Sequence, residues 1–131
     1  MTNSRVQLPD ACLTIATHEV DDVAYYELDG ILDSTTASVL LDAVGRLAAG
    51  AVETVIVGCG RLSFIDAGGL TALLRARALA ADAGAGLALA HPSGLLRRIL
   101  HATALTDALP VADASRLAGL DRSAAVSHRS G

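Results

Sequence analysis

Hydrophobic and polar positions alternate along two neighbouring stretches near the beginning of the chain. In the first, residues 12–20 (CLTIATHEV), Leu13 and Ile15 are each followed by a smaller or more polar residue, which is the period of a half-buried strand. The second, residues 23–32 (VAYYELDGIL), follows a turn at Asp21-Asp22. The pattern predicts two strands that pair as a hairpin.

From about residue 35 the apolar positions take the spacing of an amphipathic helix. Asp33, Ser34 or Thr35 can cap the start of this helix, and Gly50 marks its end, so we predict about four helical turns. The apolar positions that define it are Ala37, Leu40, Leu41, Val44, Leu47 and Ala48.

Strands and helices alternate through the rest of the chain. A short apolar run, Thr54–Gly58, predicts a strand buried deep in a sheet, and it leads into a glycine-rich link over residues 58–69. A helix then begins near Leu70 and ends at Ala83-Gly84, and a strand covers residues 86–90. Pro92, Ser93 and Gly94 open a third helix. Its inward stripe consists of Leu95, Leu96, Ile99, Leu100 and Thr103. A short strand over Leu109–Ala112 follows, and Asp113 or Ser115 caps a final helix.

This order, β-β-α-β-α-β-α-β-α, predicts an α/β fold with a single mixed sheet of about five strands and about four helices. The helices connect parallel strands, and the initial hairpin adds an antiparallel pair. We predict one domain over residues 11–126, a flexible N-terminal arm over residues 1–10, and a frayed C-terminus over residues 127–131.

Composition excludes several classes of function. The chain has 131 residues, is 52% hydrophobic and carries a net charge of −4, and all ten of its basic residues are arginine. Without lysine there is no Walker A loop, no protein-kinase ATP site and no Schiff-base chemistry. The acidic balance and the scarcity of aromatic residues argue against binding of nucleic acid. No apolar stretch is long enough to span a membrane, so we expect a cytoplasmic protein.

Two polar segments stand where a strand gives way to a helix. In Phe64–Leu70, Asp66 can cap the following helix or take part in recognition, and the adjacent glycines allow a sharp turn and close approach of a partner. The second segment, Asp29–Thr36, places three hydroxyl side chains before the first helix, a composition that is also ordinary for a cap and turn.

These two segments resemble the anti-sigma factor antagonists of bacteria, the STAS-domain family. Gly30-Ile31-Leu32-Asp33 followed by Thr36-Ala37 is similar to the family stretch G-x-L-D-x-x-[ST]-A. Val55-Ile56-Val57 followed by Leu62-x-Phe64-Ile65-Asp66-x-x-Gly69-Leu70 is similar to its core motif, which ends in F-[IML]-D-S-S-G-L. The likeness extends over about residues 12 to 120, through the third helix and the last strand, and implies the same fold.

The resemblance implies a role in partner switching. Such an antagonist binds a kinase-type anti-sigma factor and thereby releases a sigma factor, and phosphorylation of the second serine of D-S-S-G reverses the binding. In this chain the two serines are replaced by Ala67 and Gly68, so the usual position has no hydroxyl. We therefore expect binding without the usual switch. The nearest hydroxyls, Ser63 and Thr71, are the remaining candidates for phosphorylation.

The predicted docking surface joins the turn after the second strand to the turn before the second helix and to the outer side of that helix. Asp33 and Asp66 supply carboxylates, and the paired glycines permit close approach. The predicted partner-binding residues are Asp33, Ser34, Thr35, Asp66, Ala67, Gly68, Gly69, Leu70 and Arg75.

Other chemistry has little support in the sequence. Cys12 and Cys59 form no C-x-x-C pair and are typical of small buried hydrophobic residues, although a redox role of either is the alternative. The four histidines share no ligand spacing, so we predict no metal, no cofactor and no catalytic residue. We expect a monomer or weak homodimer. The alternative function is a STAS module that binds a small ligand or scaffolds a sensor complex.

Overall fold

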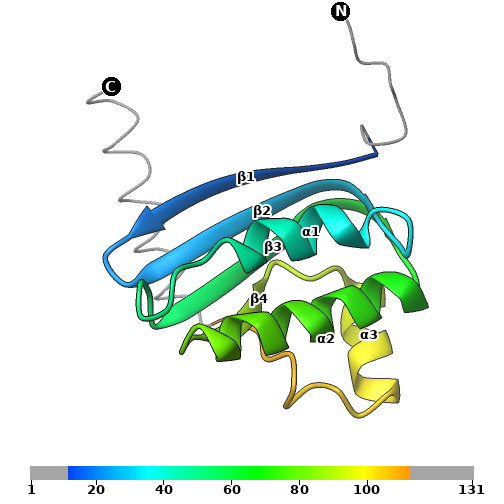
Figure 1. Cartoon of the computed structure of the whole chain (residues 1–131). Coiled ribbons are helices and arrows are strands. Elements are labelled where there is room, and N and C mark those ends of the chain that lie inside the picture. The colour runs from blue at the N-terminus through cyan, green and yellow to red at the C-terminus, as the bar shows by residue number, and fades with distance from the viewer. Residues whose placement is uncertain (1–11, 113–131) are drawn as a thin grey trace, which may run out of the picture.

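The computed structural model describes residues 12–112, which form one four-stranded mixed sheet and three helices (Figure 1). In chain order the elements are β1 (Leu13–Val20), β2 (Val23–Leu32), α1 (Ala37–Gly45), β3 (Thr54–Ile65), α2 (Ala67–Asp82), β4 (Gly86–Ala90) and α3 (Gly94–Ala102). The sequence prediction of an α/β fold with a mixed sheet is confirmed. The described residues form four strands and three helices, where the sequence predicted about five strands and about four helices for the whole domain.

The sheet order is β1-β2-β3-β4, so every strand lies beside its neighbour in sequence. β1 and β2 pair antiparallel as the predicted hairpin, from Val20 opposite Val23 to Leu13 opposite Gly30. β2 pairs parallel with β3, and β3 pairs parallel with β4. The parallel pairs require crossover connections, which α1 and α2 provide.

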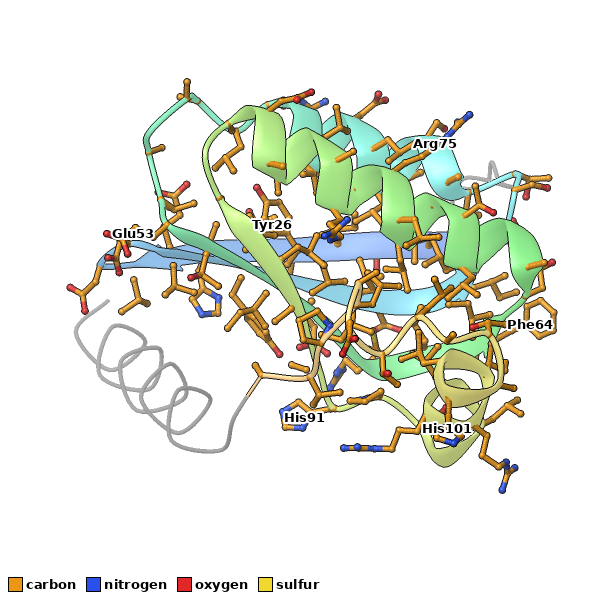
Figure 2. The ribbon with its side chains drawn as sticks, turned by 90° about the horizontal axis from the view of Figure 1, so that it is seen from below. Tyr26, Glu53, Phe64, Arg75, His91 and His101 are labelled. Atoms are coloured by element: carbon orange, nitrogen blue, oxygen red, sulfur yellow. The ribbon has the colours of Figure 1, made fainter. Side chains whose placement is uncertain are left out.

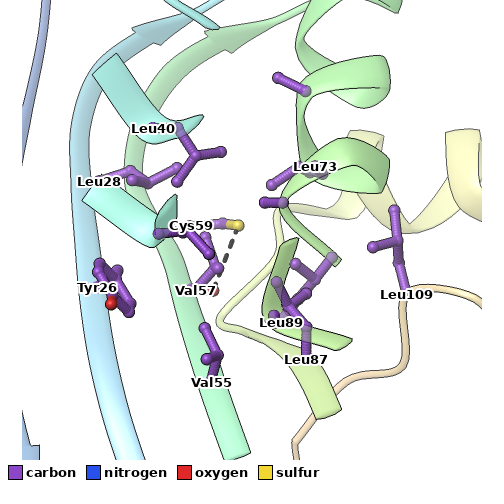
Figure 3. Close-up of a cluster of buried hydrophobic side chains, with 14 of the residues drawn as sticks. Tyr26, Leu28, Leu40, Val55, Val57, Cys59, Leu73, Leu87, Leu89 and Leu109 are labelled. Carbon is purple, nitrogen blue, oxygen red and sulfur yellow. Dashed lines mark hydrogen bonds between the residues drawn. The ribbon is translucent and has the colours of Figure 1, made fainter. Parts of the chain in front are cut away.

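Helices α1 and α2 lie on the same face of the sheet (Figure 1). The main core fills the space between them and the strands, and it is almost entirely aliphatic (Figure 3). Val55, Val57 and Cys59 of β3 point into this layer, while Ile56 belongs to a smaller cluster with Val23 and Ala90. This alternation follows from the two-residue period of a strand.

Helix α1 is shorter than predicted. It covers nine residues, about two and a half turns rather than four, and it ends at Gly45. Glycine is a poor helix former, and here it is followed by the capping residue Arg46, so Leu47 and Ala48 lie outside the helix.

The glycine-rich link was predicted wrongly as a connection, because most of it belongs to β3. This strand continues to Ile65, which pairs with Leu32. A side chain at Gly58 would lie 2.6 Å from the Tyr25 hydroxyl, so this glycine allows close packing within the sheet rather than a turn. In consequence α2 begins at Ala67, earlier than the predicted Leu70.

The predicted last strand is reduced to a single bridge between Leu89 and Val111. Two backbone hydrogen bonds support it, from the amide of Leu89 to the carbonyl of Pro110 and from the amide of Ala112 to the carbonyl of Leu89. Residue 110 is proline and has no amide hydrogen, so it cannot donate the preceding bond that would extend the ladder. The predicted final helix, the N-terminal arm and the frayed C-terminus lie outside the described residues.

Candidate functional site

Two turns meet at the end of the sheet where β2 and β3 finish. Because these strands are parallel and Leu32 pairs with Ile65, the chain leaves both strands at the same edge. The turn after β2 leads into α1, and the turn after β3 leads into α2. The carboxyl edge of parallel strands is a common location for binding sites. The fold therefore brings together the two segments that the sequence singled out.

The turn after β2 is organised by Asp33. One of its carboxylate oxygens, Oδ1, accepts hydrogen bonds from the backbone amides of Thr35 (2.9 Å) and Thr36 (3.1 Å) and from the Thr35 hydroxyl (2.7 Å). These bonds, the Thr35 hydroxyl first, lower the pKa of the Asp33 carboxyl. Thr36, rather than one of the predicted residues, occupies the N-cap position, and its buried hydroxyl donates to the Ile31 carbonyl at 2.8 Å. Asp33 thus fixes the turn.

The turn after β3 is organised by Asp66. Its side chain is the N-cap of α2 and accepts from the Gly69 amide at 3.0 Å. The helix begins immediately after it, with Leu70 donating to the Asp66 carbonyl at 2.9 Å. The capping role that the sequence allowed for Asp66 is confirmed.

Replacing Asp66 by alanine is expected to reduce the free energy of unfolding by about 1 kcal/mol, because the Gly69 amide loses its acceptor. Urea denaturation followed by circular dichroism measures the change. Asp66→Asn is the matched control, since an asparagine oxygen can still cap the helix and should retain most of the stability. An asparagine variant as unstable as the alanine variant would contradict the capping role.

The two glycines that follow Asp66 lie against the first turn. A Cβ atom at Gly68 would be 2.8 Å from the backbone nitrogen of Ser34 and 3.0 Å from its Cβ. At Gly69 it would overlap the Leu32 carbonyl oxygen. Both positions are tighter than real Cβ contacts allow, so the chain around Ser34 is packed onto the start of α2. Of the predicted docking residues, these are the ones the structure brings into contact across the two turns.

The other predicted docking residues differ in exposure. Thr35 and Ala67 are exposed, whereas Leu70 is half-buried and packs against the core. Arg75 is exposed two turns further along α2 and projects away from Phe64 (Figure 2). Its spacing of four residues from Thr71 places the two on one side of the helix. The participation of Arg75 in a shared surface stays a prediction.

The two candidate hydroxyls for phosphorylation already have backbone partners. Ser63 donates to the Gly30 carbonyl at 3.1 Å, and Thr71 donates to the Ala67 carbonyl at 3.0 Å. Both residues are exposed. Their modification stays a prediction.

The two cysteines have opposite surroundings. Cys59 is only 3% exposed, and its thiol contacts the Val57 carbonyl oxygen at 3.6 Å within the core (Figure 3). Burial, with a smaller contribution from the charge of Glu27, raises the pKa of this thiol to about 12. Cys12 is exposed. The burial of Cys59 fits a structural role, and its raised pKa leaves little of the thiolate that redox chemistry requires.

We expect a thiol reagent such as dithionitrobenzoate to react rapidly with one thiol of the native protein at pH 8. The reactive group is Cys12, because a thiol with a pKa of about 12 holds little thiolate at this pH. In urea the second thiol should react as well. Rapid release of two equivalents from the native wild type, or of one equivalent from the native Cys12→Ser variant, would contradict the assignment.

Sequence reasoning missed two exposed hydrophobic side chains at this end of the molecule. Leu95 was predicted to face inward, but 54% of its surface is exposed. The exposed fraction of Phe64 is 51%. α3 buries Leu96 and Leu100 instead, so the inward stripe is narrower than the apolar pattern suggested. Leu95 and Leu96 are consecutive and therefore lie about 100° apart around the helix, and that was the available signal.

Within residues 12–112, no three His, Cys, Asp or Glu side chains come together in a way that could hold a metal ion. No helix in this part of the chain is both long and apolar enough to cross a membrane.

A family model for the STAS domain matches residues 14–118, which include both turns. The chain belongs to the STAS domain family. The resemblance read from the two motifs is therefore confirmed, and the closely packed turns are a feature of this STAS domain. No curated protein matches the sequence.

Solved structures show the same relationship. The unphosphorylated anti-sigma factor antagonist SpoIIAA is 27% identical, with a TM-score of 0.58 over 83% of this chain and 96% of that chain. An anti-sigma factor antagonist from Mycobacterium paratuberculosis is 23% identical, with a TM-score of 0.66 over 79% and 87% of the two chains. A sulfate transporter family protein from Wolinella succinogenes is 25% identical, with a TM-score of 0.58 over 67% and 71%. This STAS domain is thus similar to antagonists and to a transporter-family protein.

Proposed function

We propose that this STAS domain is a cytoplasmic anti-sigma factor antagonist that acts by binding alone. It binds a kinase-type anti-sigma factor and releases the sigma factor, and it catalyses no reaction. The similarity to SpoIIAA, which extends over most of both chains, supports this role. The docking surface consists of the turns at residues 33–35 and 66–70 with the exposed side of α2.

The packing of Ser34 against Gly68 is the observation that carries the second part of the proposal, the absence of the usual serine switch. SpoIIAA is known in a phosphorylated and an unphosphorylated form. In this chain the position that resembles the family's phosphorylated serine has no hydroxyl, and the turn after β2 lies so close to it that a side chain there would have to displace Ser34. The surface therefore stays in one form, without the added charge of roughly −1.5 to −2 that a phosphate would bring.

The proposal is tested by titrating the protein into a complex of sigma factor and kinase-type anti-sigma factor from the same organism. We expect release of the sigma factor, in the presence and absence of ATP, and no phosphate on the antagonist by intact mass. Thr35→Arg should block release, because it places a bulky cation on the exposed turn. Thr17→Arg, at an exposed position on β1, is the matched control. A phosphate on Ser63 or Thr71 would overturn the claim that the switch is absent.

The similarity to a sulfate transporter family protein favours a second candidate. In that case the domain binds a small ligand or scaffolds a sensor complex, with no sigma factor involved. An affinity pull-down from the source cytoplasm separates the two. Recovery of an ATP-binding anti-sigma factor supports the first, whereas recovery of the protein itself or of sensor proteins alone supports the second.

A further inference from the structure

A second surface feature lies beside the proposed docking surface. An open hollow of about 260 Å³ lies between the end of β3 and the beginning of α3. Two of the residues that line it, Phe64 and Leu95, have half-exposed side chains. Figure 2 shows Phe64 at the same end of the molecule as the first turn of α2 and α3. The complete lining is Cys59, Leu62, Ser63, Phe64, Ile65, Ser93, Leu95 and Leu96.

The exposure of these side chains is not a requirement of the fold. Leu96 and Leu100 already attach α3 to the core, and Ile65 attaches the end of β3. Phe64 and Leu95 therefore leave large apolar surfaces in water without a partner inside the described part of the chain. A cluster of exposed apolar side chains in a hollow is typical of a binding site.

The distribution of charge along the chain gives a first indication of the charge of the occupant. Residues 12–66 contain nine acidic residues and two arginines, whereas residues 67–112 contain four arginines and only Asp82 and Asp107. Asp82 is the last residue of α2, a 16-residue helix whose opposite end lies beside Phe64. The α3 side of the hollow thus belongs to the basic part of the chain, whereas its β3 side belongs to the acidic part.

Two features place positive charge on the α3 side of the hollow. Arg98 is exposed and lies three residues after Leu95, on the same side of α3. Ser93, which lines the hollow, is the N-cap of α3, and its hydroxyl accepts from the Leu96 amide at 3.0 Å. The positive end of the α3 dipole therefore opens at the hollow. Asp66, the nearest acidic residue in sequence to Phe64, is turned toward the Gly69 amide.

We propose that this hollow binds an acidic segment of the protein partner that inserts one large apolar side chain between Phe64 and Leu95. The inference rests on the proposed function in one respect, since the proposed function identifies the partner as the anti-sigma factor. Ile65 and Asp66 connect the hollow to the turn at 66–70, so one partner can cover both. Carboxylates that flank the inserted side chain pair with Arg98, which provides orientation and faster association.

Calorimetric titration of single variants with the anti-sigma factor tests whether the hollow takes part in binding. We expect Phe64→Ala and Leu95→Ala each to weaken binding about tenfold or more, as for central apolar contacts. Val111→Ala is the matched control, since its side chain is also exposed but lies outside the hollow. Thermal unfolding checks that each variant is folded. Unchanged affinity in both hollow variants would overturn the proposal.

The charge is tested with Arg98→Glu, which we expect to weaken binding at low salt and to flatten its salt dependence. Arg46→Glu makes the same change of charge beside the β1–β2 hairpin and should have little effect. Equal effects of the two reversals would overturn the local role of Arg98. A dimer of the wild-type protein that Phe64→Ala dissociates would instead identify a second copy as the occupant, and the proposal would be wrong.

A peptide experiment separates this inference from the proposed function. The probes are two labelled peptides with a central phenylalanine, one flanked by glutamates and the other by lysines. We expect the glutamate peptide alone to shift the NMR amide signals of Phe64 and Leu95 in the full chain. If no anti-sigma factor binds the wild type but these shifts occur, the proposed function fails and the hollow stands. If neither peptide shifts them, the hollow as proposed is wrong.

Discussion

Replacing Gly69 by alanine should destabilise the protein by about 3 kcal/mol, even though alanine is the better helix former by about 1 kcal/mol. The added Cβ would overlap the Leu32 carbonyl oxygen and lie 2.7 Å from the Cγ1 atom of Ile65. Gly69 is buried, and Leu32 is paired with Ile65 in the sheet, so the Leu32 carbonyl cannot move away without separating α2 from the strands. Urea denaturation measures the loss as a lower midpoint.

The control for this prediction is Gly45→Ala at the end of α1. A Cβ there would meet nothing within 4 Å, and the residue is helical. We expect this variant to be more stable than wild type by about 0.5 to 1 kcal/mol. If both variants were stabilised alike, the packing of α2 against the end of β2 would be looser than the structure indicates.

Replacing Gly68 by serine should restore control by phosphorylation. The new hydroxyl stands at the position that resembles the family's modified serine, so the cognate anti-sigma kinase with ATP is expected to add one phosphate, seen by intact mass. The unmodified variant should lose about 1 kcal/mol of stability, because the turn at Ser34 has to yield to the new Cβ. The phosphorylated form should bind the anti-sigma factor at least tenfold more weakly, because charge is added beside the turns.

Gly68→Ala is the matched control for the serine variant. It carries the same Cβ and the same strain but no hydroxyl, so it should show the loss of stability and remain unmodified. If the alanine variant also lost tenfold in affinity without ATP, the weaker binding would come from displacement of the turn and not from phosphate. Failure of the kinase to modify the serine variant, while it modifies a relative that has D-S-S-G, would mean that the packed turn blocks access.

Hydrophobic periodicity predicted the hairpin and the positions of all three described helices. In these elements the apolar residues recur with the period of the strand or helix, because one face of each element is buried. The end of β3 could not be predicted in this way. Gly58 and Gly60 favour turns when read locally, and only the pairing of β3 with β2, with Tyr25 and His91 close to the two glycines, makes them part of a strand. Tertiary packing, which a local pattern does not contain, decided the structure there.

The candidate site shows a similar division. The cap at Asp66 was predictable, because a short acidic side chain before a helix has a well-defined role. The contact between Ser34 and Gly68 was not, because it depends on the parallel register of β2 and β3. The exposure of Leu95 was hidden by its apolar neighbours, of which only Leu96 and Leu100 are buried in α3.

The packing of Ser34 on Gly68 also links the residue at position 68 to the conformation of the turn after β2. A return to serine at residue 68 meets the backbone nitrogen of Ser34 before its side chain, so trimming Ser34 to glycine relieves only part of the conflict. The connection between β2 and α1 must change as well. We therefore expect the two positions to be epistatic, so that the effect of a substitution at residue 68 on stability depends on the residue at position 34.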